Sequence, residues 1–182
     1  MTTTITMMND IVTQEEILLS LLQGEDGKVW GFERGWKFST KDTVCGWEGV
    51  ECDNGSVTSI VISESDLSAT IPSSFSLLSE LKVIDLSHNM IRGTIPPGLS
   101  NLQKLETIIM SQNLLTGLLP RFTSTKLKTL DLTSNKLTGM MPEDMVSPDS
   151  VEEIMLGHNI LSGTIPTDIT KMSKLVVVDI SG

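Results

Sequence analysis

Apolar residues recur along most of the chain in a fixed order. Residues 81–96 read LKVIDLSHNMIRGTIP, with Leu81, Ile84 and Leu86 at the first, fourth and sixth positions. The fourth and sixth positions share one face of an extended strand, because side chains alternate in direction along β structure. The same order returns in LETIIMSQNLLTGLLP, LKTLDLTSNKLTGMMP and VEEIMLGHNILSGTIP, with a weaker copy in VTSIVISESDLSATIP. We number the positions of each copy as slots, from its first residue.

The copies begin at residues 57, 81, 105, 127, 151 and 175, at spacings of 24 residues apart from one of 22. A period of this length indicates a solenoid, in which equivalent residues of successive coils stack about 4.8 Å apart. The short copy lacks two residues somewhere in 121–126. We therefore predict a right-handed α/β solenoid, with a parallel sheet on its concave side and irregular or 3₁₀ segments on its convex side.

Polar and special residues also keep their slots. An Asn amide in slot nine can satisfy backbone groups that a coil turn leaves buried and unpaired. Glycine in slot thirteen supplies backbone freedom, and proline in slot sixteen needs no N–H partner. The asparagines are Asn89, Asn113, Asn135 and Asn159.

Residues 13–56 are predicted to form a cap, because an open solenoid end would expose its apolar interior. Thr13 followed by Glu16 is a capping box, Gly24 stands where a helix would end, and residues 17–22 supply an apolar face. The pair Asn54-Gly55 predicts a tight turn before the first repeat strand. The predicted organisation is a flexible tail at 1–12, a cap at 13–56 and repeats at 57–182.

The pattern L-x-x-L-x-L-x-x-N-x-L-x-G-x-I-P resembles the plant-type leucine-rich repeat. The string CGWEGVEC, from Cys45 to Cys52, resembles the N-terminal cap of the same family. This resemblance implies the ectodomain of a receptor-like kinase or receptor-like protein, placed outside the cell or at its surface. It also implies a Cys45–Cys52 disulfide, where spacing alone leaves two free thiols as the alternative. Asn54 begins an N-x-[ST] sequon, which predicts glycosylation there or marks a plain turn.

Charge and hydropathy exclude several classes of function. The net charge of −10 and isoelectric point near 4.5 oppose binding to nucleic acid or to an anionic membrane. No apolar run approaches the roughly 18–20 residues of a membrane span. The first lysine is Lys28, so no basic segment of a signal peptide is visible near the N-terminus.

The sequence predicts no enzyme, cofactor or metal site. Nucleotide-binding, zinc-protease and serine-hydrolase motifs are missing from it. The two histidines, His88 and His158, belong to coils about 14 Å apart, which is too far to share a metal ion.

Slots two, three, five, seven and eight are expected to face outward from the strands and to form the concave wall, which repeat proteins commonly use for binding. Slot two alternates lysine and glutamate, which predicts pairing between neighbours. Slot five alternates acidic and apolar residues, which would suit a peptide with basic and apolar side chains; a solvated ladder without a ligand is the alternative. The candidate binding residues are Val61, Lys82, Asp85, His88, Glu106, Ile109, Gln112, Lys128, Asp131, Glu153, Met155, His158 and Asp179.

The function predicted from these features is recognition of a protein or peptide ligand in signalling or defence, with a co-receptor as a further possible partner. Two alternatives stay open within the same family: a secreted enzyme inhibitor of the polygalacturonase-inhibitor type, and a surface scaffold. An intracellular adaptor is a further alternative, and free thiols at Cys45 and Cys52 would favour it.

Overall fold

The computed structural model describes residues 12–22, 44–147 and 149–181. The helix end predicted at Gly24 and nearly all of the predicted tail at 1–12 lie outside these ranges. Those two expectations therefore stay predictions.

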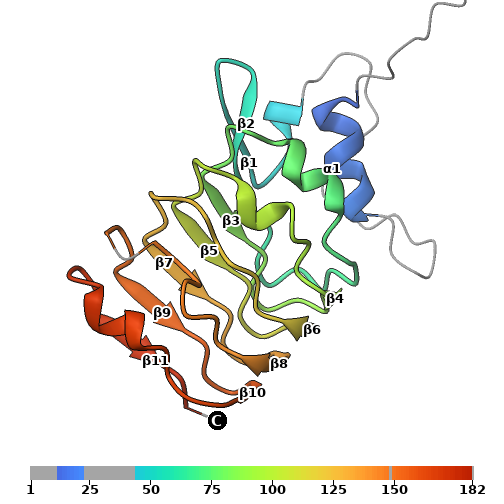
Figure 1. Cartoon of the computed structure of the whole chain (residues 1–182). Helices are drawn as coiled ribbons and strands as arrows, with labels where there is room; N and C mark the ends of the chain where they lie inside the picture. Colours follow the sequence, from blue (N-terminus) through green and yellow to red (C-terminus); the bar gives the residue numbers. More distant parts are fainter. Residues whose placement is uncertain (1–11, 23–43, 148, 182) are drawn as a thin grey trace, which may run out of the picture.

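The coils stack through one seven-stranded sheet (Figure 1). The strands, in their order across the sheet, are β1 (Val50–Asp53), β2 (Ser56–Val61), β3 (Val83–Asp85), β5 (Thr107–Ile109), β7 (Thr129–Asp131), β9 (Glu153–Met155) and β11 (Val177–Asp179). Every neighbouring pair is parallel apart from the β1–β2 hairpin. Residues of the same slot face each other across each parallel pair, so the predicted solenoid with its parallel sheet is confirmed.

Stacking creates continuous apolar columns inside the coil. Leu86, Met110, Leu132 and Leu156, all in slot six, are each at most 1% exposed. Ile180 continues the column at the last coil and is partly buried. The recurrence of apolar residues every 24 or 22 positions is thus explained by their shared position in successive turns.

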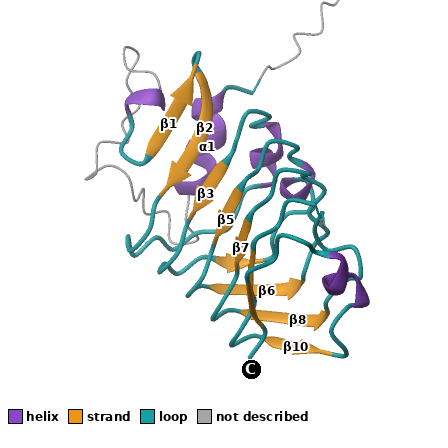
Figure 2. Ribbon diagram, turned by 90° about the vertical axis from the view of Figure 1, so that its left-hand side faces the viewer, coloured by secondary structure: helices purple, strands orange, loops and turns teal. Residues whose placement is uncertain are grey.

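A second, four-stranded parallel sheet flanks the first (Figure 2). It contains β4 (Arg92–Gly93), β6 (Leu114–Leu118), β8 (Lys136–Met140) and β10 (Ile160–Ser162). The sequence predicted only irregular or 3₁₀ structure outside the concave sheet, so this sheet is an addition to the prediction. The 3₁₀ helices η3 (Ser73–Leu77), η4 (Leu99–Asn101) and η5 (Thr167–Lys171) follow farther along the coils.

Glycine in slot thirteen is required for two reasons. Gly117 and Gly139 have φ angles of 83° and 82°, which side chains rarely adopt. A Cβ atom on Gly139 would also lie 2.5 Å from Cδ2 of Leu118, and one on Gly117 would lie 2.8 Å from Cγ2 of Thr94. Each glycine therefore leaves room for a side chain of the preceding coil.

The slot-nine asparagines join adjacent coils. Oδ1 of Asn113 accepts a hydrogen bond from the backbone N–H of Ile91 at 2.8 Å, and its amide nitrogen donates to the carbonyl of Leu86 at 2.8 Å. The same nitrogen also lies 3.2 Å from the carbonyl oxygen of Met110. Asn89, Asn135 and Asn159 make equivalent bonds. The predicted role of these amides is confirmed.

The helix α1 (Gln14–Leu22) lies at the N-terminal end of the stack, beside the β1–β2 hairpin (Figure 1). Its predicted capping box is present, because Oγ1 of Thr13 accepts from the N–H of Glu16 and Oε2 of Glu16 accepts from the N–H of Thr13. The Gln14 amide attaches the helix to the hairpin: it accepts from the N–H of Val57 at 2.7 Å and donates to the carbonyl of Gly55 at 3.0 Å.

The predicted disulfide joins Cys45 to Cys52, within the segment that carries the buried Trp47. The tight turn at Asn54-Gly55 is also confirmed. Both residues have positive φ, at 49° and 79°, as a two-residue turn of type I′ requires.

The short copy loses its two residues where a 3₁₀ helix would stand. Residues 121–126 are irregular, and Phe122 and Ser124 are buried there. The hydroxyl of Ser124 donates to the carbonyl of Leu105 at 2.7 Å. A side chain thus replaces a turn of backbone in contacting the preceding coil.

We expect Asn113→Ala to lower the free energy of unfolding by about 2–4 kcal/mol, because it leaves buried backbone groups of two coils without partners. Urea denaturation followed by circular dichroism measures this loss. The matched control is Asn101→Ala, which removes an exposed amide and should change stability by less than about 0.5 kcal/mol. Equal stability of the two variants would contradict the bridging role.

We expect Glu16→Gln to lower stability at neutral pH and to have less effect at acid pH. The backbone N–H and hydroxyl of Thr13 hold the pKa of Glu16 below its ordinary value. A lowered native-state pKa stabilises the fold above the unfolded-state value, and this contribution is lost as the pH falls through the native value. Urea midpoints of wild type and variant at a series of pH values test this. Glu15→Gln controls for a charge in the same helical turn, and a gap that stays constant with pH contradicts the assignment.

Candidate binding surface

The slot-five residues form one unbroken row across the outward side of the seven-stranded sheet. Backbone pairing places Val61 beside Asp85, Asp85 beside Ile109, and Ile109 beside Asp131. The row continues through Met155 to Asp179. Val61 is 42% exposed, and the other five are partly exposed. The predicted alternation of acidic and apolar residues thus exists in space.

Each slot-five aspartate is held by a local turn. Oδ1 of Asp85 accepts from the N–H and the hydroxyl of Ser87, at 2.9 and 2.6 Å. Oδ1 of Asp131 accepts from the N–H of Thr133 at 3.0 Å, and Asp179 repeats the arrangement with Ser181. The donors on Ser181 hold the pKa of Asp179 below its ordinary value. These turns fix the carboxylates in place while using one oxygen of each.

Slot seven was expected to contribute exposed side chains to the concave wall, and in three coils its residue is buried instead. Ser87 and Ser111 are 7% and 9% exposed, and Gly157 is buried as well. In the β3 coil the cause is the turn just described, which draws the serine hydroxyl back onto Asp85. We therefore define the concave face as the outward side chains of slots two, three, five and eight.

The slot-two ladder pairs at one step. Nζ of Lys128 lies 3.1 Å from Oε2 of Glu106. No other ion pair is formed within this ladder in the described part of the chain, so the predicted pairing holds for one step of the row. Beside the ladder, Glu153 accepts a hydrogen bond from the hydroxyl of Thr129 at 3.3 Å.

Slot eight has a left-handed backbone in every described coil. The φ angles of Glu64, His88, Gln112, Ser134 and His158 lie between 50° and 56°. His88 and Gln112 are hydrogen-bonded through nitrogen atoms 3.3 Å apart. The backbone N–H of His158 donates to the carbonyl of Ser181, so His158 lies near the end of the slot-five row. Within the described residues, no group of histidine, cysteine and acidic side chains could hold a metal ion.

The concave face is acidic. Two lysines, Lys82 and Lys128, stand against a larger set of carboxylates in the same slots. These are Glu64, Asp85, Glu106, Asp131, Glu152, Glu153 and Asp179. The excess of negative charge favours a ligand with positive charge.

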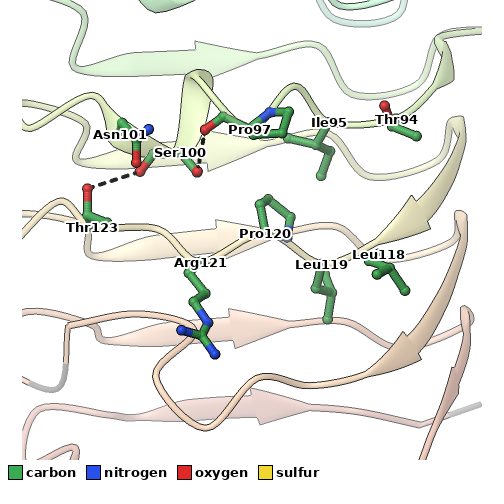
Figure 3. A pocket seen from close by; sticks show the side chains of 10 residues that line it. All are labelled: Thr94, Ile95, Pro97, Ser100, Asn101, Leu118, Leu119, Pro120, Arg121 and Thr123. Atoms are coloured by element: carbon green, nitrogen blue, oxygen red, sulfur yellow. Dashed lines mark hydrogen bonds between the residues drawn. The ribbon is translucent and has the colours of Figure 1, made fainter.

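A second surface, which the sequence did not predict, lies around the exposed Leu118 on the flanking sheet. Leu118 and Met140 are each 68% exposed in adjacent coils. A hollow of about 540 Å³ is lined by residues between 94 and 101 of one copy and residues between 118 and 123 of the shortened copy (Figure 3). Arg121 also lines the hollow and forms an ion pair with Asp144 at 3.0 Å. In the sequence, the shortened repeat spacing was the one feature that indicated an irregularity near this surface.

Comparison with known families identifies repeats over most of the solenoid. Residues 55–120 match a family model described as leucine-rich repeat, and residues 126–147 match a second model of the same description. The described part of the chain contains no helix long and apolar enough to span a membrane.

Several solved structures are similar to the chain. The PEPR1–AtPEP1 complex is 31% identical, with a TM-score of 0.82 over 91% of this chain and 24% of that chain. The plant peptide hormone receptor RGFR1 in complex with RGF2 is 34% identical, with a TM-score of 0.65 over 67% of this chain and 20% of that one. The BIR3–SERK2 complex from Arabidopsis thaliana is 30% identical, with a TM-score of 0.70 over 88% of this chain and 91% of that one. The chain thus spans about a quarter or less of the first two and nearly all of the third.

We expect Asp131→Ala to lower stability by about 1 kcal/mol, because the N–H of Thr133 loses its acceptor. Asp131→Asn should cost less, because an amide oxygen can still accept that bond. Thermal unfolding of both variants separates the turn from the charge. Equal losses in the two variants would show that the charge, and not the turn, stabilises this coil.

Proposed function

Because the chain belongs to the plant leucine-rich-repeat proteins, we propose that it forms part of a receptor-like ectodomain and recognises a peptide or protein ligand on its concave face. The observation that carries this proposal is the continuous row from Val61 to Asp179. The charged and apolar side chains of this row are exposed or partly exposed to solvent and do not pack inside the coil.

The solenoid fold and its similarity to receptor ectodomains identify the chain as a binding module and not an enzyme. Two of the similar structures, PEPR1–AtPEP1 and RGFR1–RGF2, are complexes, and RGFR1 is a peptide hormone receptor. This supports a peptide as the ligand class. The third, BIR3–SERK2, is a complex of two proteins, which supports a co-receptor as a further partner.

An extracellular position fits the disulfide, because such bonds persist in oxidising compartments. In that setting we propose N-glycosylation at Asn54, which is exposed at the tip of the β1–β2 hairpin. We also propose residues 13–56 as the N-terminal cap and residues 57–182 as the repeat region. The bonds between Gln14 and the hairpin support this division, because they attach α1 to the first coil.

The test of the proposed binding face uses one substitution on each of two surfaces. Peptides selected from a random display library on the wild-type chain are measured against Ile109→Arg, on the concave face, and Leu118→Arg, on the flanking sheet. Both variants introduce the same bulky cation, at the partly exposed Ile109 and at Leu118, which is 68% exposed. Circular dichroism and thermal unfolding confirm that each remains folded.

We expect Ile109→Arg to weaken binding of the selected peptides at least tenfold and Leu118→Arg to leave it unchanged, because a central substitution disrupts a buried contact. Fluorescence anisotropy with labelled peptides measures both. The reverse result, with binding lost only in Leu118→Arg, would assign recognition to the flanking sheet and overturn the proposal.

A further inference from the structure

We propose that the concave face binds a peptide in the polyproline II conformation that carries lysine or arginine at every third position. This inference rests on the proposed function and specifies the chemistry of its ligand. The basic side chains meet Asp85, Asp131 and Asp179, and one of the two residues between successive basic side chains lies over Ile109 or Met155.

The spacing of the acidic row is the first argument. Asp85 and Asp131 are separated by one strand, as are Asp131 and Asp179. Neighbouring strands lie about 4.8 Å apart, so the carboxylates follow one another at about 9.6 Å. The whole acidic row therefore extends over about 19 Å, or four strand spacings.

A polyproline II helix matches this interval. It has three residues per turn and rises about 3.1 Å per residue, so residues i and i+3 lie on one side at about 9.3 Å. A β-strand places i and i+3 on opposite faces, and its same-face neighbours recur at about 6.6 Å. Of these two extended conformations, only polyproline II presents side chains at the interval of the aspartates. Seven residues with basic side chains at the first, fourth and seventh positions span the whole row.

The aspartates are prepared to meet cations. Each uses Oδ1 in its own turn, and the described residues supply no donor to the other oxygen of Asp85 or Asp131. The turn removes much of the side-chain freedom that an ion pair would otherwise have to fix. Lys128, three residues before Asp131, is paired with Glu106, and Lys82 stands in the same slot of the Asp85 coil. The row therefore presents fixed negative charges at regular intervals.

The positions between the aspartates are apolar. Ile109 lies between Asp85 and Asp131 in the row, and Met155 lies between Asp131 and Asp179. Both side chains are partly exposed. Two of the three side-chain rows of a polyproline II helix can face a flat surface, so one of the two prolines between successive basic residues can lie over each of them. Proline would also hold the peptide in the required conformation before binding. Both the charged and the apolar parts of the floor thus fit one ligand.

The experiment compares two synthetic peptides of identical composition. The first reads Arg-Pro-Pro-Arg-Pro-Pro-Arg, and the second reads Arg-Pro-Arg-Pro-Arg-Pro-Pro. Isothermal titration calorimetry on the wild-type chain at low ionic strength measures their dissociation constants. We expect the first to bind about tenfold more tightly, because the second aligns fewer of its charges with the aspartates.

Two sets of variants test where the peptide binds. Replacing Asp85, Asp131 and Asp179 together by asparagine keeps an acceptor for each turn and removes the charge of the row. The control replaces the exposed Asp53, Asp66 and Asp149 by asparagine, which changes the net charge equally on other surfaces. We expect the first set to weaken binding of the three-residue peptide about tenfold and the control set to weaken it less than twofold.

The outcomes separate this inference from the proposed function. Equal affinity of the two peptides, no binding of either, or equal effects of the two variant sets would overturn the inference. In each of these cases Ile109→Arg can still abolish binding of the library-selected peptides. The concave face then binds a ligand of another chemistry, and the proposed function stands. Loss of library-selected peptides only in Leu118→Arg would overturn both.

Discussion

The structure depends on the register between coils. Each parallel strand places a residue beside its equivalent in the next coil, and the slot-nine asparagines repeat the same alignment at the turn. A shift by one residue would turn the inner column of Leu86 and Met110 outward and would separate Asn113 from the backbone of the preceding coil. The register of the strands therefore decides which side chains are buried and which buried polar groups find hydrogen-bond partners.

This constraint decides which residues are free to serve recognition. The residues of slots one, four, six and nine lie in the interior, so the differences between copies of the repeat are concentrated in the outward slots. Asp131 shows how closely the two roles are joined, since one oxygen closes a local turn and the other receives no donor from the residues that the structure describes. A side chain on the concave face is thus positioned by the same coil geometry that builds the core.

The sequence predicted features that have a local or family signature and missed those that depend on contacts between distant residues. Leu86, Asn113 and the capping box follow from local patterns with a fixed physical meaning, and the disulfide came from resemblance. Gln14 could not be assigned, because its partner Val57 is 43 residues away and the intervening spacing carries no signal. Ser124 was hidden for a similar reason: the shortened spacing located the loss, but not the hydroxyl that replaces it.

Two surface features differ from what the sequence predicted, and both lie beyond the concave strands. Slot seven was expected to be exposed from strand alternation, but the strand ends at slot five, and Ser87 is buried with its hydroxyl bonded to Asp85. The flanking sheet was missed because its strands are short and lie in slots ten to fourteen, around the slot-thirteen glycine, where strand propensity is low. The slot-five row was predicted correctly, because there the two-residue alternation applies.

The side chain of Leu118 packs against Gly139 of the next coil, so the contact between coils at this position has a direction along the solenoid. Each slot-thirteen glycine accommodates a side chain from the coil before it, so crowding at one coil is relieved by displacing its N-terminal neighbour. Exposed side chains such as Leu118 can move away into solvent, whereas the buried columns cannot. The flanking sheet is therefore the side of the solenoid on which exposed side chains can differ between related proteins without a change in the spacing of the coils.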